Sequence, residues 1–314
     1  MRNTIDRLLS RPGFVLIFFF CAFTAGSQVP QDSMVLNSAS PKAKPHLYHI
    51  NYWVTGAISV VGTVGDMIAI PSILHAKKPI TDAEFAALNL SSVNGIDRWS
   101  LQQNPSSRNA FYKASDIALP VIIVASGAAL ALDNKVRQDW GNIMLMYYEM
   151  HAINFTLYNY SPFGPAFQNK FRPYAYYSEF PIEDRRSGGS RNSMYSGHVS
   201  ESIASTYFFV KVYGDYHPEI GKKIYLYYAI ATVPPLIEGY FRIRALAHFP
   251  SDIFMGLVIG GVTGIVVPEL HRYKDRKFHL TLSTPPGSTT GFGLCYDIRK
   301  TSRTLLPAFN HPHS

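Results

Sequence analysis

Hydrophobic residues along the chain gather into six long apolar stretches that are separated by polar segments. Runs of this length are typical of helices, and we expect a kink at Pro234-Pro235 in the fifth and an end at Pro268 for the sixth. The pattern predicts an all-α fold, a single helical bundle of about six core helices. The predicted helices cover residues 52–74, 117–132, 141–158, 198–213, 224–240 and 252–267.

The pattern changes on both sides of the bundle. Residues 28–48 are rich in Ser, Pro and Lys and are predicted to form a linker. The helical domain is expected to cover residues 49–270, followed by a tail over residues 271–314. Within this tail, residues 279–284 and 291–298 alternate apolar and polar positions around Pro285-Pro286-Gly287, which predicts a short hairpin in an otherwise irregular segment.

The first 27 residues have the pattern of a secretory signal peptide. Three Arg residues precede an apolar core from Phe14 to Phe23, and Ala25-Gly26-Ser27 offers small residues for cleavage before Gln28. The alternative is an uncleaved anchor helix. Either interpretation predicts a protein of the cell envelope, and we expect a periplasmic location. The three basic residues are Arg2, Arg7 and Arg11.

Composition narrows the class of protein further. Charged residues are 16% of the chain, below the roughly 25% of ordinary soluble domains, and this excludes a disordered chain. The net charge of +8 comes from no long Lys/Arg run, so we expect no nucleic-acid partner. Cys21 and Cys295 are the only cysteines, which excludes a disulfide scaffold and a cysteine-based zinc site.

Two arguments bear on whether the helices cross a membrane. A span needs about 20 apolar residues, and Asp66, Glu149 and Glu201 interrupt three of the stretches. A signal sequence followed by six spans would also leave the segment after the third helix in the cytoplasm. We therefore expect a bundle with buried rather than lipid-facing helices, with membrane embedding as the alternative. The aromatic segment 158–180 and the basic charge fit contact with an anionic membrane surface.

Three motifs at predicted helix boundaries carry the candidate chemistry. Two Arg side chains can hold phosphate oxygens through planar forks. A Ser-Gly-His sequence opens the fourth helix, where free amide groups favour an anion and glycine allows its close approach. A His with an Asp four residues later can act as an oriented nucleophile, while the other His acts as general acid. The motifs are Arg172-Pro173, Ser196-Gly197-His198 and Arg242…His248…Asp252.

This motif set resembles the phosphatidic acid phosphatase type 2 and haloperoxidase superfamily over residues 50–270. The resemblance implies an all-helical bundle that transfers a phosphoryl group through a phosphohistidine, without metal or cofactor. It implies that His248 is the nucleophile, Asp252 its orienting partner and His198 the acid. The implied phosphate ligands are Arg172, Arg242, Ser196 and Gly197.

The sequence departs from the family pattern at three positions. The family Lys is expected seven residues before Arg172, where Pro165 stands in a segment that cannot form a regular helix. Tyr195 replaces a Pro and Phe241 replaces a Ser. Another cation is therefore expected to complete the phosphate site, and Arg191 ranks before Lys170 because Lys170 lies only two residues from Arg172.

The sequence thus predicts a phosphatase of phosphate monoesters or pyrophosphates, with a phosphorylated lipid as the favoured substrate and a small phosphate ester as the simpler one. A vanadium-dependent haloperoxidase is the first alternative, because the same pocket can hold vanadate. A binding protein with a decayed site is the second, because the family Lys is missing.

Overall fold

The computed structural model describes residues 47–272, 278–283 and 291–296. The predicted signal peptide and nearly all of the predicted linker lie outside these residues. Six described helices have 20 residues or more, and each overlaps one of the six predicted stretches. They are α3 (Tyr52–Ala76), α6 (Arg108–Leu132), α7 (Trp140–Tyr160), α9 (Gly197–Tyr216), α10 (Ile224–Arg244) and α11 (Pro250–His271).

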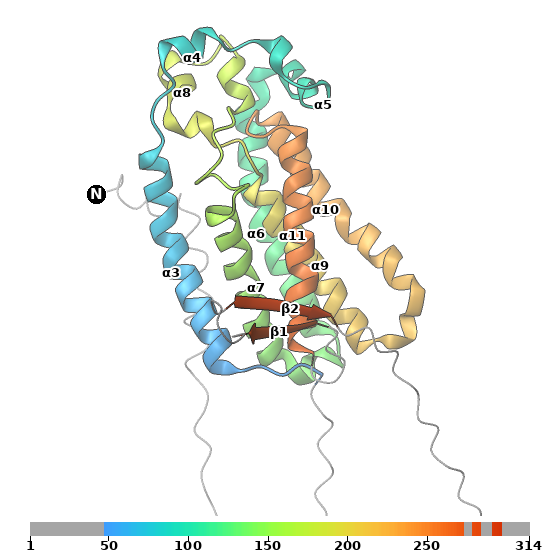
Figure 1. The fold of residues 1–314 in the computed structure, drawn as a ribbon. Coiled ribbons are helices and arrows are strands. Elements are labelled where there is room, and N and C mark those ends of the chain that lie inside the picture. Colours follow the sequence, from blue (N-terminus) through green and yellow to red (C-terminus); the bar gives the residue numbers. More distant parts are fainter. Residues whose placement is uncertain (1–46, 273–277, 284–290, 297–314) are drawn as a thin grey trace, which may run out of the picture.

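The long helices form one bundle around α9, which contacts α6, α7, α10 and α11, while α3 packs on α7 (Figure 1). Short helices gather at one end of this bundle, near the start of α6 and the end of α3. We call this the site end. The short elements there are α4 (Asp82–Ala86), α5 (Gly95–Arg98), α8 (Ile182–Arg186) and the 3₁₀ turns Leu90–Ser92, Trp99–Gln102, Pro105–Ser107, Pro173–Tyr176 and Gly188–Arg191. Two further 3₁₀ turns, Val136–Asp139 and Pro218–Lys223, join long helices at the opposite end.

A stripe of glycines brings α11 into close contact with α9. A Cβ atom at Gly256, Gly260 or Gly264 would collide with backbone carbonyl oxygens of α9 and of Ser196, the residue just before it. Small residues at this four-residue spacing let helix backbones approach, which is common where helices associate inside a membrane. The contact fixes the starts of α9 and α11 beside each other at the site end.

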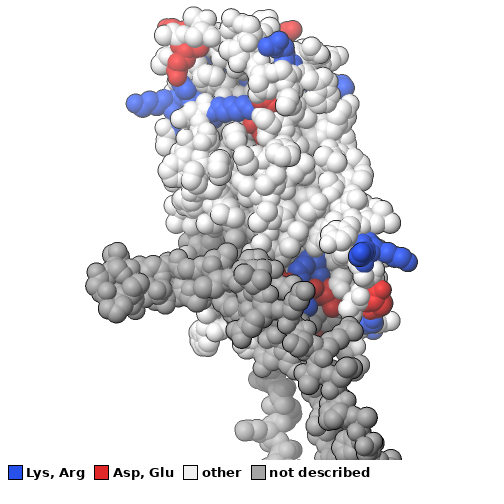
Figure 2. Space-filling view, turned by 45° about the vertical axis from the view of Figure 1, so that its right-hand side comes forward, with Lys and Arg blue, Asp and Glu red and all other residues white. Residues whose placement is uncertain are grey.

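The outer surface of the bundle is strongly apolar. Among the described residues, three helices are long and apolar enough to cross a membrane, by length and composition: Tyr52–Ile73, Pro105–Leu132 and Pro250–His271. In the most apolar 18-residue segment of each helix, only 22%, 22% and 44%, respectively, is buried inside the protein. Figure 2 shows charged side chains near the two ends of the visible face and a wide uncharged band between them. The expectation of buried rather than lipid-facing helices is therefore wrong.

Two predicted helix limits also change, and the predicted kink at Pro234-Pro235 lies inside a continuous helix. α6 begins at Arg108, nine residues before the predicted start, because the helix continues through Asp116. α10 runs without interruption through Pro234 and Pro235, and α11 runs through Pro268 to His271. Proline removes one helical hydrogen bond, but in these helices the neighbouring turns continue.

The predicted hairpin is present in the tail. β1 (Phe278–Ser283) pairs antiparallel with β2 (Gly291–Tyr296), and Leu280 lies opposite Leu294. The two strands lie across the end of the bundle opposite the site end (Figure 1). The all-α prediction with a hairpin tail is therefore confirmed.

Candidate phosphate-binding site

The motif residues come from four segments that meet at the site end. His198 is the second residue of α9, Arg242 lies in the last turn of α10, and His248 lies between α10 and α11. Arg172 precedes the turn Pro173–Tyr176. The charges of Arg172 and Arg242 and the His198 ring all lie close enough to His248 to lower its pKa. The structure therefore brings these four side chains together.

His248 is buried, with 2% of its surface exposed, and its ring is held by a backbone carbonyl. The Nδ1 atom lies 2.6 Å from the oxygen of Ser193. A carbonyl oxygen only accepts, so Nδ1 carries the proton and Nε2 keeps a free lone pair. Burial, followed by the charges of Arg172 and Arg242, holds the pKa of His248 well below its ordinary value. The ring is therefore neutral at pH 7.

His198 lies beside a carboxylate that no sequence motif indicated. Its Nε2 is 3.2 Å from Oδ1 of Asp116 on α6, and 29% of its side chain is exposed. Burial and the charge of Arg242 lower the pKa of His198 to about 4, while Asp116 opposes this shift. An arriving phosphate would neutralise the Arg charges and raise this pKa, which favours the protonated form that a general acid needs.

Arg242 and Arg172 are positioned by polar contacts that leave other donor atoms free. Arg242 donates from Nη1 to Oγ of Ser115 at 3.0 Å, lies 3.6 Å from Asp116 and stacks over the ring of Tyr112. The backbone amide of Arg172 donates to the oxygen of Ser190 at 2.7 Å. Among the described residues, the buried Nε atoms of both Arg and the buried Oγ of Ser196 have no hydrogen-bond partner. Buried donors of this kind are suited to an anion.

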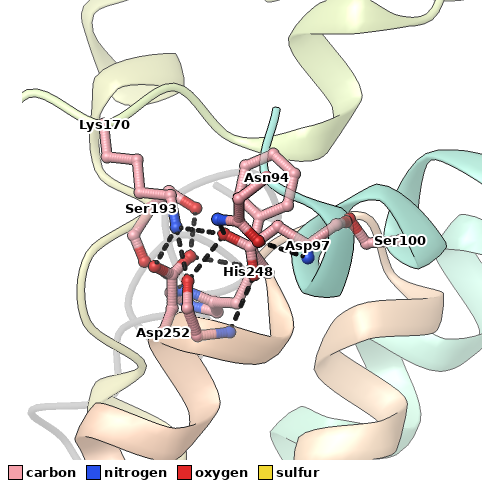
Figure 3. A network of polar contacts seen from close by, with 9 residues as sticks. Asn94, Asp97, Ser100, Lys170, Ser193, His248 and Asp252 are labelled. Atoms are coloured by element: carbon pink, nitrogen blue, oxygen red, sulfur yellow. Dashed lines mark hydrogen bonds and ion pairs between the residues drawn. The ribbon is translucent and has the colours of Figure 1, made fainter. Parts of the chain in front are cut away.

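Asp252 does not contact His248 in the way that the motif spacing suggested. One carboxylate oxygen accepts from Oγ of Ser193 at 2.6 Å and from the amide of Phe249 at 2.9 Å. The other accepts from Nζ of Lys170 at 2.8 Å. Figure 3 shows that Ser193 lies between Asp252 and His248. We correct the expected role: Asp252 orients His248 through Ser193.

Lys170 is held between two buried carboxylates and is not a free cation of the phosphate site. Its Nζ atom lies 2.9 Å from Asp97 and 2.8 Å from Asp252, and it also donates to Oγ of Ser251 at 2.7 Å (Figure 3). Asp97 comes from α5 and also binds the amide of Ser251. This Asp97–Lys170–Asp252 cluster fastens α5 and the loop before Arg172 to the start of α11.

Arg191, the first-ranked substitute for the missing Lys, is engaged on another side of the loop. It donates from Nη2 to Glu84 at 2.6 Å and from Nε to the oxygen of Lys78 at 3.0 Å. The segment around Pro165 is irregular as predicted, because α7 ends at Tyr160. Neither Arg191 nor Lys170 therefore offers an unpaired positive charge to His248.

Gly197 and Tyr195 explain how the start of α9 is shaped. A Cβ atom on Gly197 would lie 3.1–3.3 Å from the ring of Tyr158, so the glycine makes room for this partly buried aromatic side chain. Tyr158 also packs edge-on against Tyr195 at 5.4 Å. Gly197 was expected to admit the ligand, and the group nearest to it in the structure is the Tyr158 ring.

The sequence interpretation missed Asp116, Ser193 and Asp97. Asp116 directly precedes the predicted helix over residues 117–132, so it looked like the boundary of that apolar stretch. A charged residue within an apolar stretch can also indicate a functional site. Ser193 acts partly through its backbone carbonyl, which leaves no sequence signal. Asp97 lies more than 70 residues before its partner Lys170, so its role depends on the tertiary fold.

Comparison with known proteins matches part of the chain to a protein family. Residues 150–276 match the family model of the PAP2 superfamily, a range that includes both histidines and both Arg of the site. The chain is also similar to the crystal structure of a transmembrane PAP2-type phosphatidylglycerolphosphate phosphatase from Bacillus subtilis, with 18% identity and a TM-score of 0.37. That similarity covers 67% of this chain and 94% of the other. A comparison with curated proteins gives no match.

Proposed function

Because residues 150–276 belong to the PAP2 superfamily, we propose that the protein is a membrane phosphatase. It hydrolyses phosphate monoesters or pyrophosphates, and a phosphorylated lipid is its favoured substrate. One observation carries the proposal: Arg172 and Arg242 lie beside the neutral His248 and keep buried Nε atoms without a protein partner. Fixed guanidinium groups stabilise the charge that a phosphoryl group spreads over its oxygens.

In the first half of the reaction, the lone pair on Nε2 of His248 attacks phosphorus. A P–N bond forms, and the P–O bond to the lipid alcohol breaks. His198 gives its proton to the leaving oxygen, which departs as a neutral alcohol. The carbonyl of Ser193 stabilises the positive charge that develops on the His248 ring, because it already accepts a hydrogen bond from Nδ1.

In the second half, water attacks phosphorus and the P–N bond breaks. His198, now neutral, accepts the proton of this water, and inorganic phosphate leaves with His248 restored. Arg172 and Arg242 bind the phosphoryl oxygens in both halves. These steps assign no role to a metal, and added chelator is expected to leave activity unchanged.

The lipid substrate is supported by the surface that surrounds the site. The span Tyr52–Ile73 ends near the site end, and the span Pro250–His271 begins there. A phosphate at His248 would therefore lie close to the level of lipid headgroups. A small soluble phosphate ester can reach the same pocket from the water side.

We place the protein in a membrane of the cell envelope. Tyr48 pairs with Arg272 just past the end of α11, whereas His248 lies just before its start, so Tyr48 and the site are at opposite ends of the bundle. If α3 crosses the membrane and a signal peptide over residues 1–27 is cleaved, α3 begins on the periplasmic side, and the site at its other end lies in the cytoplasm. A periplasmic site requires the opposite orientation, in which residue 47 lies on the cytoplasmic side. These are alternative proposals. A single cysteine placed at Ser178, tested for labelling by a membrane-impermeant reagent, distinguishes them.

Assays on the purified protein in detergent test the proposed function. We expect release of inorganic phosphate from phosphatidic acid and from para-nitrophenyl phosphate, with no loss when EDTA is added. Halide oxidation after addition of vanadate and hydrogen peroxide, without phosphate release, would instead support a haloperoxidase. Neither activity, from protein that is folded by circular dichroism, would support a binding protein with a decayed site.

A further inference from the structure

A groove of about 560 Å³ opens at the end of α3, on the other side of the loop that carries Arg172. We call it the basic groove. Three of its lining residues are apolar, and we call them the apolar wall: Ile73, Ala76 and Ala166. The polar lining residues, which we call the basic wall, are Ser72, Lys77, Lys78, Asn169 and Arg191.

The basic groove lies where a membrane span ends. The apolar segment Tyr52–Ile73 finishes at its apolar wall, and Lys77 and Lys78 follow within one helical turn. Lysines at the end of a span extend to the level of the lipid headgroups. With Tyr52–Ile73 in the membrane, the groove therefore lies at the level of the lipid headgroups.

Arg191 and Lys77, two positively charged residues of the groove, differ in whether a negative charge lies beside them. Arg191 forms an ion pair with Glu84. Within the described part of the chain, the hydrogen bonds of Lys77 go to neutral oxygen atoms: the carbonyls of Gln168 and Arg191 and the side-chain amide of Asn169. Burial, and then the charges of Arg191 and Arg172, lower the pKa of Lys77 to about 8. A nearby anion would offset this repulsion.

The groove and the catalytic pocket share the same two chain segments. The oxygen of Ser190 accepts from the amide of Arg172, and the oxygen of Lys170 accepts from the amide of Ser193. Lys77 binds the neighbouring residues Gln168, Asn169 and Arg191 of these segments. A ligand in the groove would therefore lie beside the segments that place Arg172 and Ser193, while the charge of Arg172 acts on both sides.

We propose that the basic groove binds a second acidic group, such as another phosphate, of the lipid substrate whose reacting phosphate lies at His248. This inference rests on the proposed function and specifies its substrate class: a lipid that carries two acidic groups on its headgroup. Lys77 and Lys78 provide the charge, and the apolar wall accommodates the adjoining part of the lipid.

The test compares three substrates in mixed micelles. Phosphatidic acid carries a single phosphate, phosphatidylinositol 4-phosphate carries a second, and para-nitrophenyl phosphate carries no lipid. Lys78→Ala removes the exposed side chain of Lys78. Lys77 is more buried, and Lys77→Met removes its charge but keeps an apolar side chain of similar length. We expect each variant to raise KM for phosphatidylinositol 4-phosphate about tenfold, the effect of losing one charge-assisted contact. KM for phosphatidic acid should change little, and kcat for para-nitrophenyl phosphate should be unchanged.

Lys222→Ala is the matched control, because this lysine lies in the turn Pro218–Lys223 that joins the far ends of α9 and α10. It should leave all three substrates unaffected. Unchanged KM for phosphatidylinositol 4-phosphate in both groove variants, or an equal rise for both lipids, would overturn the proposal while wild-type phosphate release upholds the function. If the wild-type protein releases phosphate from none of the substrates, the proposed function itself fails.

Discussion

The carbonyl oxygen of Ser193 accepts a hydrogen bond of 2.6 Å from Nδ1 of His248. The hydroxyl group of the same serine donates to Asp252, also at 2.6 Å. Ser193 thus fixes the ring of the proposed nucleophile and is itself fixed by the carboxylate. A carbonyl in this place selects the tautomer with a free Nε2, as a carboxylate would, but it adds no negative charge beside the ring.

Replacing Ser193 tests this relay. In Ser193→Ala the carbonyl remains, but its link to Asp252 is lost, so the His248 ring is held less firmly. We expect kcat to fall about tenfold with KM nearly unchanged, because loss of alignment affects the transition state more than binding. Steady-state kinetics with para-nitrophenyl phosphate measures both constants. Ser193→Thr keeps the hydroxyl and should restore most of kcat. Wild-type kinetics in Ser193→Ala would show that Asp252 does not act through Ser193.

The Asp97–Lys170–Asp252 cluster is expected to contribute mainly to stability. In Lys170→Met, two buried carboxylates lose their shared cation, which should destabilise the fold by about 3–5 kcal/mol. The double variant Lys170→Met/Asp97→Asn removes one of the two negative charges and should recover part of the lost stability. Thermal unfolding in detergent measures the stability of the single and the double variant. A Lys170→Met protein with wild-type Tm and a kcat/KM lowered 10²-fold or more would instead identify Lys170 as a phosphate-binding cation.

Arg191 gives a complementary prediction. Its guanidinium group is paired with Glu84, so Arg191→Ala should leave kcat/KM for para-nitrophenyl phosphate within about threefold of the wild type. Removal of a preorganised donor in the transition state costs on the order of 10²–10³ in rate. A loss of that size would show that Arg191 reaches the phosphate during the reaction and completes the site in place of the family Lys.

The buried histidines make a prediction about pH. The pKa of His198 is lowered from 6.5 to about 4 in the folded protein. Between about pH 6.5 and pH 4 the unfolded chain therefore binds a proton that the folded chain does not, so stability falls as the pH falls through this range. We expect the Tm of the wild type to drop between pH 7 and pH 5, and His198→Gln to drop less. Equal slopes for the two proteins would contradict the neutral state of the His198 ring in the folded protein.

Much of the fold could be predicted from the sequence, because long apolar runs have few alternatives to helices. The start of α6 could not, because Asp116 interrupts the run; inside the bundle the same residue lies near His198 and Arg242. Surface exposure of the helices was also mispredicted. Apolar stretches look the same whether they face lipid or a protein core, and only the packing of α9 at the centre distinguishes the two cases.

The sequence predicted the site residues whose side chains belong to a motif. It could not predict contacts made by backbone groups or by residues far apart in the sequence. His198, His248, Arg172 and Arg242 follow from motifs at helix boundaries. The spacing of His248 and Asp252 suggested a direct contact, but Asp252 binds the amide of Phe249 and caps the start of α11. The pairing of Lys170 with Asp97 joins residues far apart in sequence, and no local pattern indicates it.

The most direct test of the account is the chemical identity of the reaction intermediate. The protein is incubated with ³²P-labelled phosphatidic acid, quenched in alkali, in which phosphohistidine is stable, and digested for mass spectrometry. The account predicts one labelled residue, His248, phosphorylated on Nε2 because Nδ1 is bound to Ser193, and no label in His248→Asn. Label on another residue, phosphate on Nδ1 of His248, or undiminished turnover in His248→Asn would contradict the central claim.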